Sequence, residues 1–389
     1  MKSFEPHLSR ARHQRAVFSA GAFLVFGLFL TLWPISVASW ESGQGPDLRI
    51  EVERWEDAEK IFRNDLHWLG GDGASSVDLG GTRVLWLFGD SFVNPGTSKL
   101  RSEAAIVRNS IAIQTGYDPT RAEMKFYWKG PTPTPASFFR EEGNTWFWPG
   151  SGIAIKDRLL IFLMRVRPAK NELGFEPCGW KAVLVSNPGK EPPCWSIRYL
   201  KGPQTKGDII VGTGSALLTG DFLYVFSTNW RDNKVYLVRW HIRPASTGDL
   251  SKPQWWAGRN IGWTEQASGG PKAQPVFSGG QTEFTVQYEV RIKRFLQIQT
   301  LSFLDPSLSV RTAPGLAGSW SKPASFYSPP ERSIPNTLIY AGKAHPVIKG
   351  ADLVLTYAVN STEEERLLND MDIYFPIVLK ARIMYDHTR

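Results

Sequence analysis

The sequence predicts an all-β fold, a five-bladed β-propeller preceded by an N-terminal hydrophobic helix. Three observations support this: short apolar runs split by Gly, Pro and Asn, a hairpin motif repeated five times, and one long uncharged stretch near the start. After residue 65 no segment has a clear 3.6-residue apolar period. Only two segments, 51–62 and 361–371, have a composition that would suit a short helix. Both lie at the periphery of the repeats.

The repeated motif is a strand of small residues, a tight turn and a bulkier apolar strand. Its copies start at Asp72, Trp148, Gly212, Gln281 and Lys343. Five copies at similar intervals indicate blades of about four strands. We expect the first strand of each blade to line the central channel, with Asp72, Trp148, Gly214, Glu283 and His345 on these strands. A pair of β-sandwiches is the alternative all-β fold, which a five-fold repeat disfavours.

Closure of the ring requires a strand from elsewhere in the sequence. After the fifth copy only IYFPIVLKARI (373–383) has a strand pattern. The early segment LRIEVERW, which begins at Leu48, has the composition to complete that last sheet. We therefore expect the two ends of the propeller domain, 41–389, to pair.

Residues 1–40 are predicted to be a signal peptide or an N-terminal membrane anchor. Basic residues precede an uncharged apolar run from Ala16 to Ala38, and small residues follow at its end. The run is also long enough to cross a bilayer, which favours an uncleaved anchor. In either case the remainder is exported to the periplasm or the outside of the cell, with attachment to the inner membrane if the helix is retained.

Charge and cysteine content limit the possible partners. The formal net charge is +8, part of it from the first fifteen residues, and no clustered run of Lys or Arg follows. Nucleic-acid binding, which needs such a cluster, is not expected. The two cysteines, Cys178 and Cys194, are predicted to form a disulfide. The six histidines lack zinc-site spacing, so we expect no metal or cofactor, and we expect a monomer.

The candidate catalytic residues are Asp72 and Asp90, which lie on one hairpin. Asp72 lies in GGDG, and Asp90 ends the apolar strand VLWLFGD, where burial raises a carboxyl pKa. Two acids in unlike environments are what glycoside hydrolysis needs, one to donate a proton and one to activate water. We assign Asp72 as base and Asp90 as acid, and the reverse order stays open if Arg108 or Arg140 contacts either acid.

Several polar and aromatic residues are candidates for substrate binding. Glu283 interrupts an apolar strand, His345 lies at the start of the last repeat, and the chain has 16 Trp, more than a core usually needs. The predicted binding set is Glu283, His345, Trp146, Trp148 and Asn109. Packing between blades is the alternative explanation for the Trp content.

Two other functions remain possible. A non-catalytic glycan-binding propeller would have the same fold but no need for two close carboxylates. The motif VLWLFGDSFVNPG also matches the first block of GDSL-type esterases, with Ser91 as nucleophile. The Asp that precedes the late histidine by three residues in those enzymes is missing before His345 and His387.

From Leu69 to about Ile383 the chain resembles the DUF4185 family, a domain of unknown function. The resemblance rests on WLGGDGASSVDLGGTRVLWLFGDSFV, RNSIAI, WFWPGSGIAI, GTGSALL, VRTAPGLAGSWSKP and LVLTYAVNS. It implies a five-bladed propeller. One branch of that family, glycoside hydrolase family 183, contains inverting endo-D-arabinanases whose two aspartates match Asp72 and Asp90. Related arabinanase propellers place an acidic Glu on the third blade, where this chain has GTGSALL.

Overall fold

The computed structural model describes residues 48–385 except 132–133, 172, 201, 203–204, 206–207 and 266–271. The predicted N-terminal helix, in 1–40, lies outside the described residues. The described part is mostly β-strand with a few short helices. None of its helices is both long and apolar enough to span a membrane.

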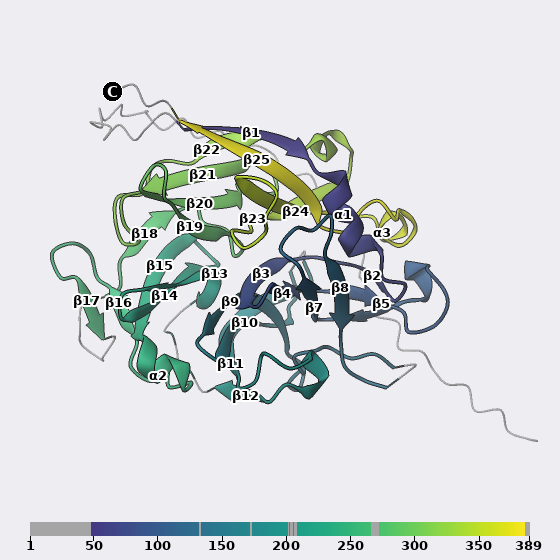
Figure 1. Cartoon of the computed structure of the whole chain (residues 1–389), viewed down its shortest axis with the longest axis horizontal. Coiled ribbons are helices and arrows are strands. Elements are labelled where there is room, and N and C mark those ends of the chain that lie inside the picture. Colours follow the sequence, from purple (N-terminus) through teal and green to yellow (C-terminus); the bar gives the residue numbers. More distant parts are fainter. Residues whose placement is uncertain are drawn as a thin grey trace, which may run out of the picture.

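In the described part of the chain, five sheets of four or more strands follow one another around a common centre (Figure 1). The first comprises β3 (Ser75–Gly80), β4 (Arg83–Phe88), β7 (Ser110–Thr115) and β8 (Glu123–Tyr127). The second comprises β9 (Trp146–Ile155), β10 (Arg158–Pro168), β11 (Phe175–Val185) and β12 (Ile197–Leu200). The third comprises β13 (Ile209–Thr219), β14 (Phe222–Asn229), β15 (Lys234–His241), β16 (Gln254–Trp256), β17 (Trp263–Glu265) and β18 (Pro275–Ser278).

The last two sheets complete the circle. The fourth contains β19 (Thr285–Glu289), β20 (Arg294–Thr300), β21 (Leu308–Ala313) and β22 (Ala324–Tyr327). The fifth contains β23 (Thr337–Ala344), β24 (Leu353–Ser361), β25 (Ile377–Tyr385) and β1 (Leu48–Arg54). A three-stranded sheet is made by β2 (Trp68–Gly71), β5 (Ser91–Val93) and β6 (Ala105–Val107). The α-helices are α1 (Glu56–Arg63), α2 (Ile242–Ser246) and α3 (Glu364–Asn369), and short 3-10 helices cover Arg101–Glu103, Pro192–Cys194 and Pro330–Ser333.

The sequence repeats coincide with the first two strands of these five sheets. Four copies span β3–β4, β9–β10, β13–β14 and β19–β20, and the fifth begins at the end of β23 and covers β24. In the first, fourth and fifth pairs the second strand is clearly the more buried, as expected for a strand between two neighbours; in β4, for example, every residue after Arg83 is buried.

Neighbouring first strands are joined by small or polar side chains. A hydrogen bond links each of four adjacent pairs: Ser151 Oγ to Gly212 O (2.9 Å), Val286 N to Ser215 Oγ (2.6 Å), Ala344 N to Thr285 Oγ1 (2.7 Å), and His345 Nδ1 with Ser76 Oγ (2.8 Å). Between β3 and β9, Gly152 packs directly against Val77. The first strands therefore contact one another in the order β3, β9, β13, β19 and β23, and the last contacts β3 again. This arrangement is a ring and not a pair of stacked sheets.

The ring closes where the two ends of the fold meet. Antiparallel β1 pairs with β25 along its whole length, from Leu48 opposite Tyr385 to Arg54 opposite Leu379. In Figure 1 the purple β1 lies beside the yellow β25. The predicted use of LRIEVERW to complete the last sheet is confirmed. The helical expectation for 51–62 holds only from Glu56, because residues 48–54 belong to the strand.

The predicted disulfide is wrong: Cys178 and Cys194 are both free. Cys178 lies near the start of β11, whereas Cys194 follows the other end of that strand, where Asn187 Nδ2 donates to its carbonyl oxygen (3.0 Å). A strand advances about 3.3 Å per residue, so the length of β11 separates the two thiols. After β11 the chain turns into β12, which pairs antiparallel only with the end of β11 that is far from Cys178, from Ile197 opposite Val185 to Leu200 opposite Ala182.

We predict that Gly212→Ala destabilises the ring much more than Gly220→Ala. Both glycines have positive φ, +80° and +56°, so each substitution carries the left-handed penalty of about 1–2 kcal/mol. A Cβ at Gly212 would also lie 2.2 Å from Phe162 Cβ, whereas Gly220 has open space. Urea unfolding should give Gly212→Ala an additional loss of about 1–3 kcal/mol. Equal losses for the two variants would contradict this packing.

Candidate active site

Asp72 lies between β2 and β3, at the entrance to the first hairpin. Its Oδ2 accepts hydrogen bonds from Tyr340 Oη (2.7 Å) and Tyr374 Oη (3.4 Å). Its Oδ1 lies over Gly89, where an added Cβ would be only 2.4 Å away. A glycine at 89 is therefore what allows the carboxyl group to take this position.

The surroundings of Asp72 favour its protonated form. The pKa of Asp72 is raised to about 8, chiefly by burial of the carboxyl group and next by the charge of Asp90. The Tyr340 hydroxyl and the nearby charge of Lys343 act in the opposite direction and only partly offset these effects. At neutral pH Asp72 therefore holds a proton that it can donate.

Asp90 follows β4 and has different neighbours. Its Oδ2 forms an ion pair with Arg108 Nη1 (3.1 Å), and its Oδ1 accepts a hydrogen bond from Trp148 Nε1 (2.8 Å). The side chain is 19% exposed. Burial raises the pKa of Asp90, while the Arg108 charge and the Trp148 N–H oppose that rise because they stabilise the carboxylate.

The structure brings the two predicted acids together. Asp72 N donates to Asp90 O (3.3 Å), and Gly89 N donates to Asp72 O (2.9 Å). Tyr374 Oη contacts both residues, because it also donates to Asp90 O (3.2 Å). The two carboxyl groups are thus held on adjoining backbone with different donors, hydroxyls for Asp72 and a cation and an indole for Asp90.

Glu283 joins the site through a buried lysine. Lys343 Nζ donates to Glu283 Oε1 (2.7 Å) and to Gly73 O, and the Lys343 side chain is only 3% exposed. An ammonium group this deeply buried needs such partners. The pair therefore fixes the Gly73 backbone next to Asp72, and Glu283, 28% exposed, keeps part of its carboxylate in contact with solvent.

Tyr374 is held in an unusual backbone conformation. Its φ is 63°, which is strained for an aromatic residue. The carbonyls of Leu69, Leu367, Asp370 and Ile373 accept hydrogen bonds from the buried Arg101 guanidinium, which fixes the segment before Tyr374. Gly71 N in turn donates to Tyr374 O (2.9 Å). A strained backbone conformation persists only where many surrounding contacts hold it in place. Here it places the Tyr374 hydroxyl group within reach of both Asp72 and Asp90.

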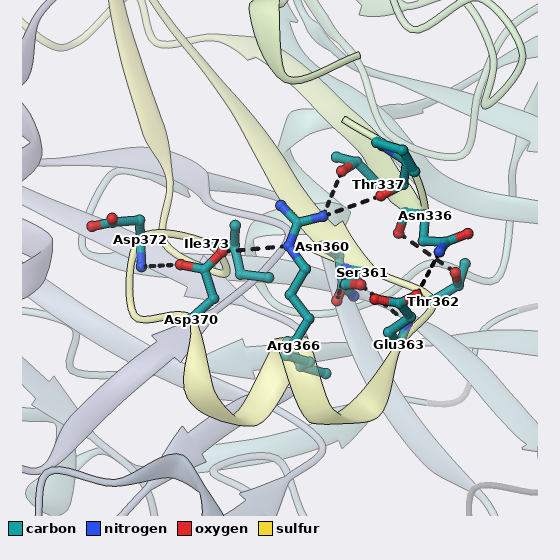
Figure 2. A network of polar contacts seen from close by, with 12 residues as sticks. Asn336, Thr337, Asn360, Ser361, Thr362, Glu363, Arg366, Asp370, Asp372 and Ile373 are labelled. Atoms are coloured by element: carbon teal, nitrogen blue, oxygen red, sulfur yellow. Dashed lines mark hydrogen bonds and ion pairs between the residues drawn. The ribbon is translucent and has the colours of Figure 1, made fainter. Parts of the chain in front are cut away.

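Tyr340 is positioned by Asn360, at the end of β24. Asn360 Nδ2 donates to Tyr340 Oη (3.2 Å), and Asn360 Oδ1 accepts from Ser361 N (2.7 Å). Figure 2 shows the network behind Asn360, in which Glu363 accepts from Asn336 (2.5 Å) and Arg366 donates to Thr337 (2.8 Å). These contacts tie the start of α3 to the start of β23.

His345 has a different place from the one expected. Its ring is buried against Trp86, Nδ1 contacts Ser76 Oγ (2.8 Å) and Nε2 contacts Thr356 Oγ1 (2.7 Å). Burial, and then the charge of Lys343, lower its pKa to about 3. Both ring nitrogens are thus occupied by protein hydroxyls, and the ring links the end of β23 to β3.

Asn109 and Trp146 are also structural. Asn109 is fully buried, donates to Phe139 O and Phe147 O and accepts from Phe139 N. Trp146 is only 7% exposed and is covered by the Arg108 guanidinium, 4.5 Å from its ring. Of the two tryptophans predicted to bind substrate, Trp146 is therefore covered by protein. Trp148 remains half-buried beside Asp90.

Ser91 lacks the environment of a nucleophile. Its side chain is fully buried, and its hydroxyl contacts Gly89 O (3.0 Å) and Ser110 Oγ (2.8 Å). Neither partner is a base, so the esterase alternative has no support in the geometry. Among the described residues, no group of three or more His, Cys, Asp and Glu side chains is placed to hold a metal ion.

Sequence reasoning missed Tyr340, Lys343, Tyr374 and Asn360. Tyr340 and Lys343 lie on β23, whereas the predicted fifth repeat began only at Lys343. Tyr374 lies in the segment 373–383, which was predicted to be a strand without a role in the site. A lysine within the apolar run LIYAGKA was the one usable signal, because a buried cation requires a carboxylate or carbonyl partner.

A ring of antiparallel sheets with an acidic pair beside its first strands defines this chain as a β-propeller protein with a candidate hydrolytic site. The chain belongs to the family DUF5005, a domain of unknown function, whose sequence model matches residues 56–380. The family comparison does not show the DUF4185 family that the motifs resemble. No curated protein matches the sequence.

Solved structures of other proteins are similar to this chain. A protein from Bacteroides ovatus ATCC 8483, provisionally described as a hydrolase, has a TM-score of 0.68 at 15% identity, over 85% of this chain and 90% of that one. At a TM-score of 0.46 and 10% identity, 82% of this chain matches 54% of xylan beta-1,4-xylosidase from Bacillus halodurans C-125. An endo-arabinase from Bacteroides thetaiotaomicron VPI-5482 has a TM-score of 0.42 at 12% identity, over 82% and 95% of the two chains.

We predict that Asp72→Asn becomes progressively more stable than the parent as pH rises from about 4 to about 8. The folded protein keeps a proton on Asp72 up to a pKa of about 8, whereas an unfolded Asp loses it near 3.9. In that window the folded state binds more protons, so the parent loses stability as pH rises, and the variant does not.

Urea unfolding of both proteins across this pH range measures the effect. The difference should be small near pH 4 and largest near pH 8. A difference that is constant with pH would mean that Asp72 is ionised at neutral pH in the folded protein.

Proposed function

We propose that this protein hydrolyses glycosidic bonds of a glycan outside the cytoplasm, with Asp72 as general acid and Asp90 as general base. The observation that carries the proposal is the pair of adjoining carboxyls with different partners, hydroxyls for Asp72 and a guanidinium and an indole N–H for Asp90. The reaction needs one carboxyl that holds a proton and a second whose carboxylate form is stabilised by nearby donors, and the two aspartates fit these roles.

These roles reverse the order expected from the sequence. Asp72 lies in a glycine-rich loop, but Tyr340 and Tyr374 enclose its carboxyl group. Burial and the neighbouring Asp90 charge raise its pKa, so that it holds a proton. Asp90 follows an apolar strand, but the Arg108 guanidinium and the Trp148 N–H stabilise its charge. The contacts made by each carboxyl, and not the polarity of its sequence neighbours, decide which one holds the proton.

The proposed reaction is a single displacement with inversion. Asp90 takes a proton from a water molecule as the water oxygen bonds to the anomeric carbon. The bond from that carbon to the leaving oxygen breaks, and Asp72 gives its proton to the leaving oxygen. Exchange with solvent then restores both groups. Glu283 lies near Asp72 through Lys343 and Gly73 and serves to bind the substrate.

We propose an arabinan-like substrate and a five-bladed propeller on the strength of the motif resemblance to the DUF4185 family. D-Arabinan is therefore the first polysaccharide to test. Export follows from the basic and then apolar pattern of residues 1–40. A glycan-binding propeller without catalysis is the second candidate, and it is favoured if the protein binds a polysaccharide and never cleaves it.

We predict that Asp72→Asn and Asp90→Asn each lower the rate of hydrolysis by at least about 100-fold, because general acid–base catalysis is typically worth 10²–10⁴-fold. Both variants should still bind the glycan. Asp157→Asn is the matched control, since that carboxylate is 77% exposed in the turn between β9 and β10.

Rates are measured as release of reducing ends from a polysaccharide that the parent cleaves. The anomer formed first, followed by NMR, reports the stereochemistry, and an inverted product is expected. Near-full activity of both Asn variants would make the assignment of the acids wrong. A retained configuration would make one acid a nucleophile instead.

A further inference from the structure

Phe303 is an exposed aromatic residue close to the candidate active site. It lies in the loop between β20 and β21, and 57% of its surface is exposed. Its ring centroid is 6.0 Å from that of Tyr340, at an interplanar angle of 61°. Because Tyr340 Oη donates to Asp72 Oδ2, one side chain separates Phe303 from the proposed acid.

The loop that carries Phe303 is held by its own hydrogen bonds. Leu301 N donates to Ser307 O (3.0 Å), Ser302 N donates to Asp305 O (2.9 Å), and Ser307 Oγ donates to Asp305 Oδ1 (2.7 Å). Gln281 Nε2 also donates to Leu301 O, which fastens the loop to the segment that leads to Glu283. The aromatic ring is thus presented from a fixed turn.

Exposing a large apolar ring next to a polar site has an energetic cost that a ligand can recover. The C–H face of a sugar ring is apolar, and it buries aromatic surface while its hydroxyls reach hydrogen-bonding groups at the edge. Such groups are at hand here, since Tyr340 contacts both Asp72 and Asn360, and Glu283, which is 28% exposed, is paired with Lys343 beside Gly73. Trp146, which the sequence favoured for this role, is buried.

We propose that Phe303 binds the substrate, as an aromatic platform for a sugar ring bound next to Asp72. This inference rests on the proposed glycosidase function and adds a residue that determines how the glycan is held. Phe303 contacts neither reacting group, so it acts on binding of the glycan and not on the proton transfers.

The test compares Phe303→Ala and Phe303→Trp with Tyr288→Ala. Tyr288 is a matched control because it is 48% exposed, lies on β19 and packs its ring against Phe295, with no contact to the acids. Steady-state kinetics on the cleaved polysaccharide give KM and kcat. The same three substitutions in the Asp72→Asn background give glycan affinity by calorimetry without turnover.

We expect Phe303→Ala to raise KM and weaken binding at least about tenfold, with kcat changed by less than about threefold. Phe303→Trp and Tyr288→Ala should stay close to the parent, and all variants should keep the parent's melting temperature. Parental KM and affinity in Phe303→Ala would overturn this inference and leave the proposed function intact. A parent that neither binds nor cleaves any glycan would overturn both.

Discussion

The pairing of β1 with β25 holds the two ends of the fold together in the last sheet. The candidate site lies where this last sheet meets the first one, and we call this junction the seam. Asp72 and Asp90 belong to the first part of the ring, whereas Tyr340, Lys343 and Tyr374 come from the last sheet and its connections. These groups meet only because the last sheet returns to the first. Arg101 strengthens the seam, since its guanidinium joins the backbone of Leu69 to that of Ile373.

The seam also explains the electrostatics of the acids. Tyr340 and Tyr374 bring hydroxyl groups and apolar ring surface over Asp72, which removes water from that carboxyl. Asp90 accepts from Trp148 on the second sheet and from Arg108, which lies between β6 and β7. Two acids on one hairpin thus acquire different environments because each is covered by a different part of the ring.

Features that depend on the local residue pattern could be predicted from the sequence. Alternating apolar residues and turn glycines located the hairpins, and the strand composition of LRIEVERW identified the segment that closes the last sheet. Asp72 and Asp90 were identifiable because they flank one hairpin. The contacts of Tyr374 with Asp72 were not, since they join residues about 300 positions apart. His345 and Asn109 were predicted to bind ligand, and in the structure their polar atoms contact protein groups, which a sequence does not show in advance.

The position of Tyr374 has a consequence for biosynthesis. This residue follows Asp72 by 302 positions in the chain, and its hydroxyl contacts both acids on the first hairpin. A nascent chain that has already formed the first hairpin and the three sheets after it still lacks Tyr374 and β25. The acids therefore acquire their final surroundings only after Tyr374 and β25 have left the ribosome. Synthesis that stops early gives a chain with both aspartates but an open and unfinished centre.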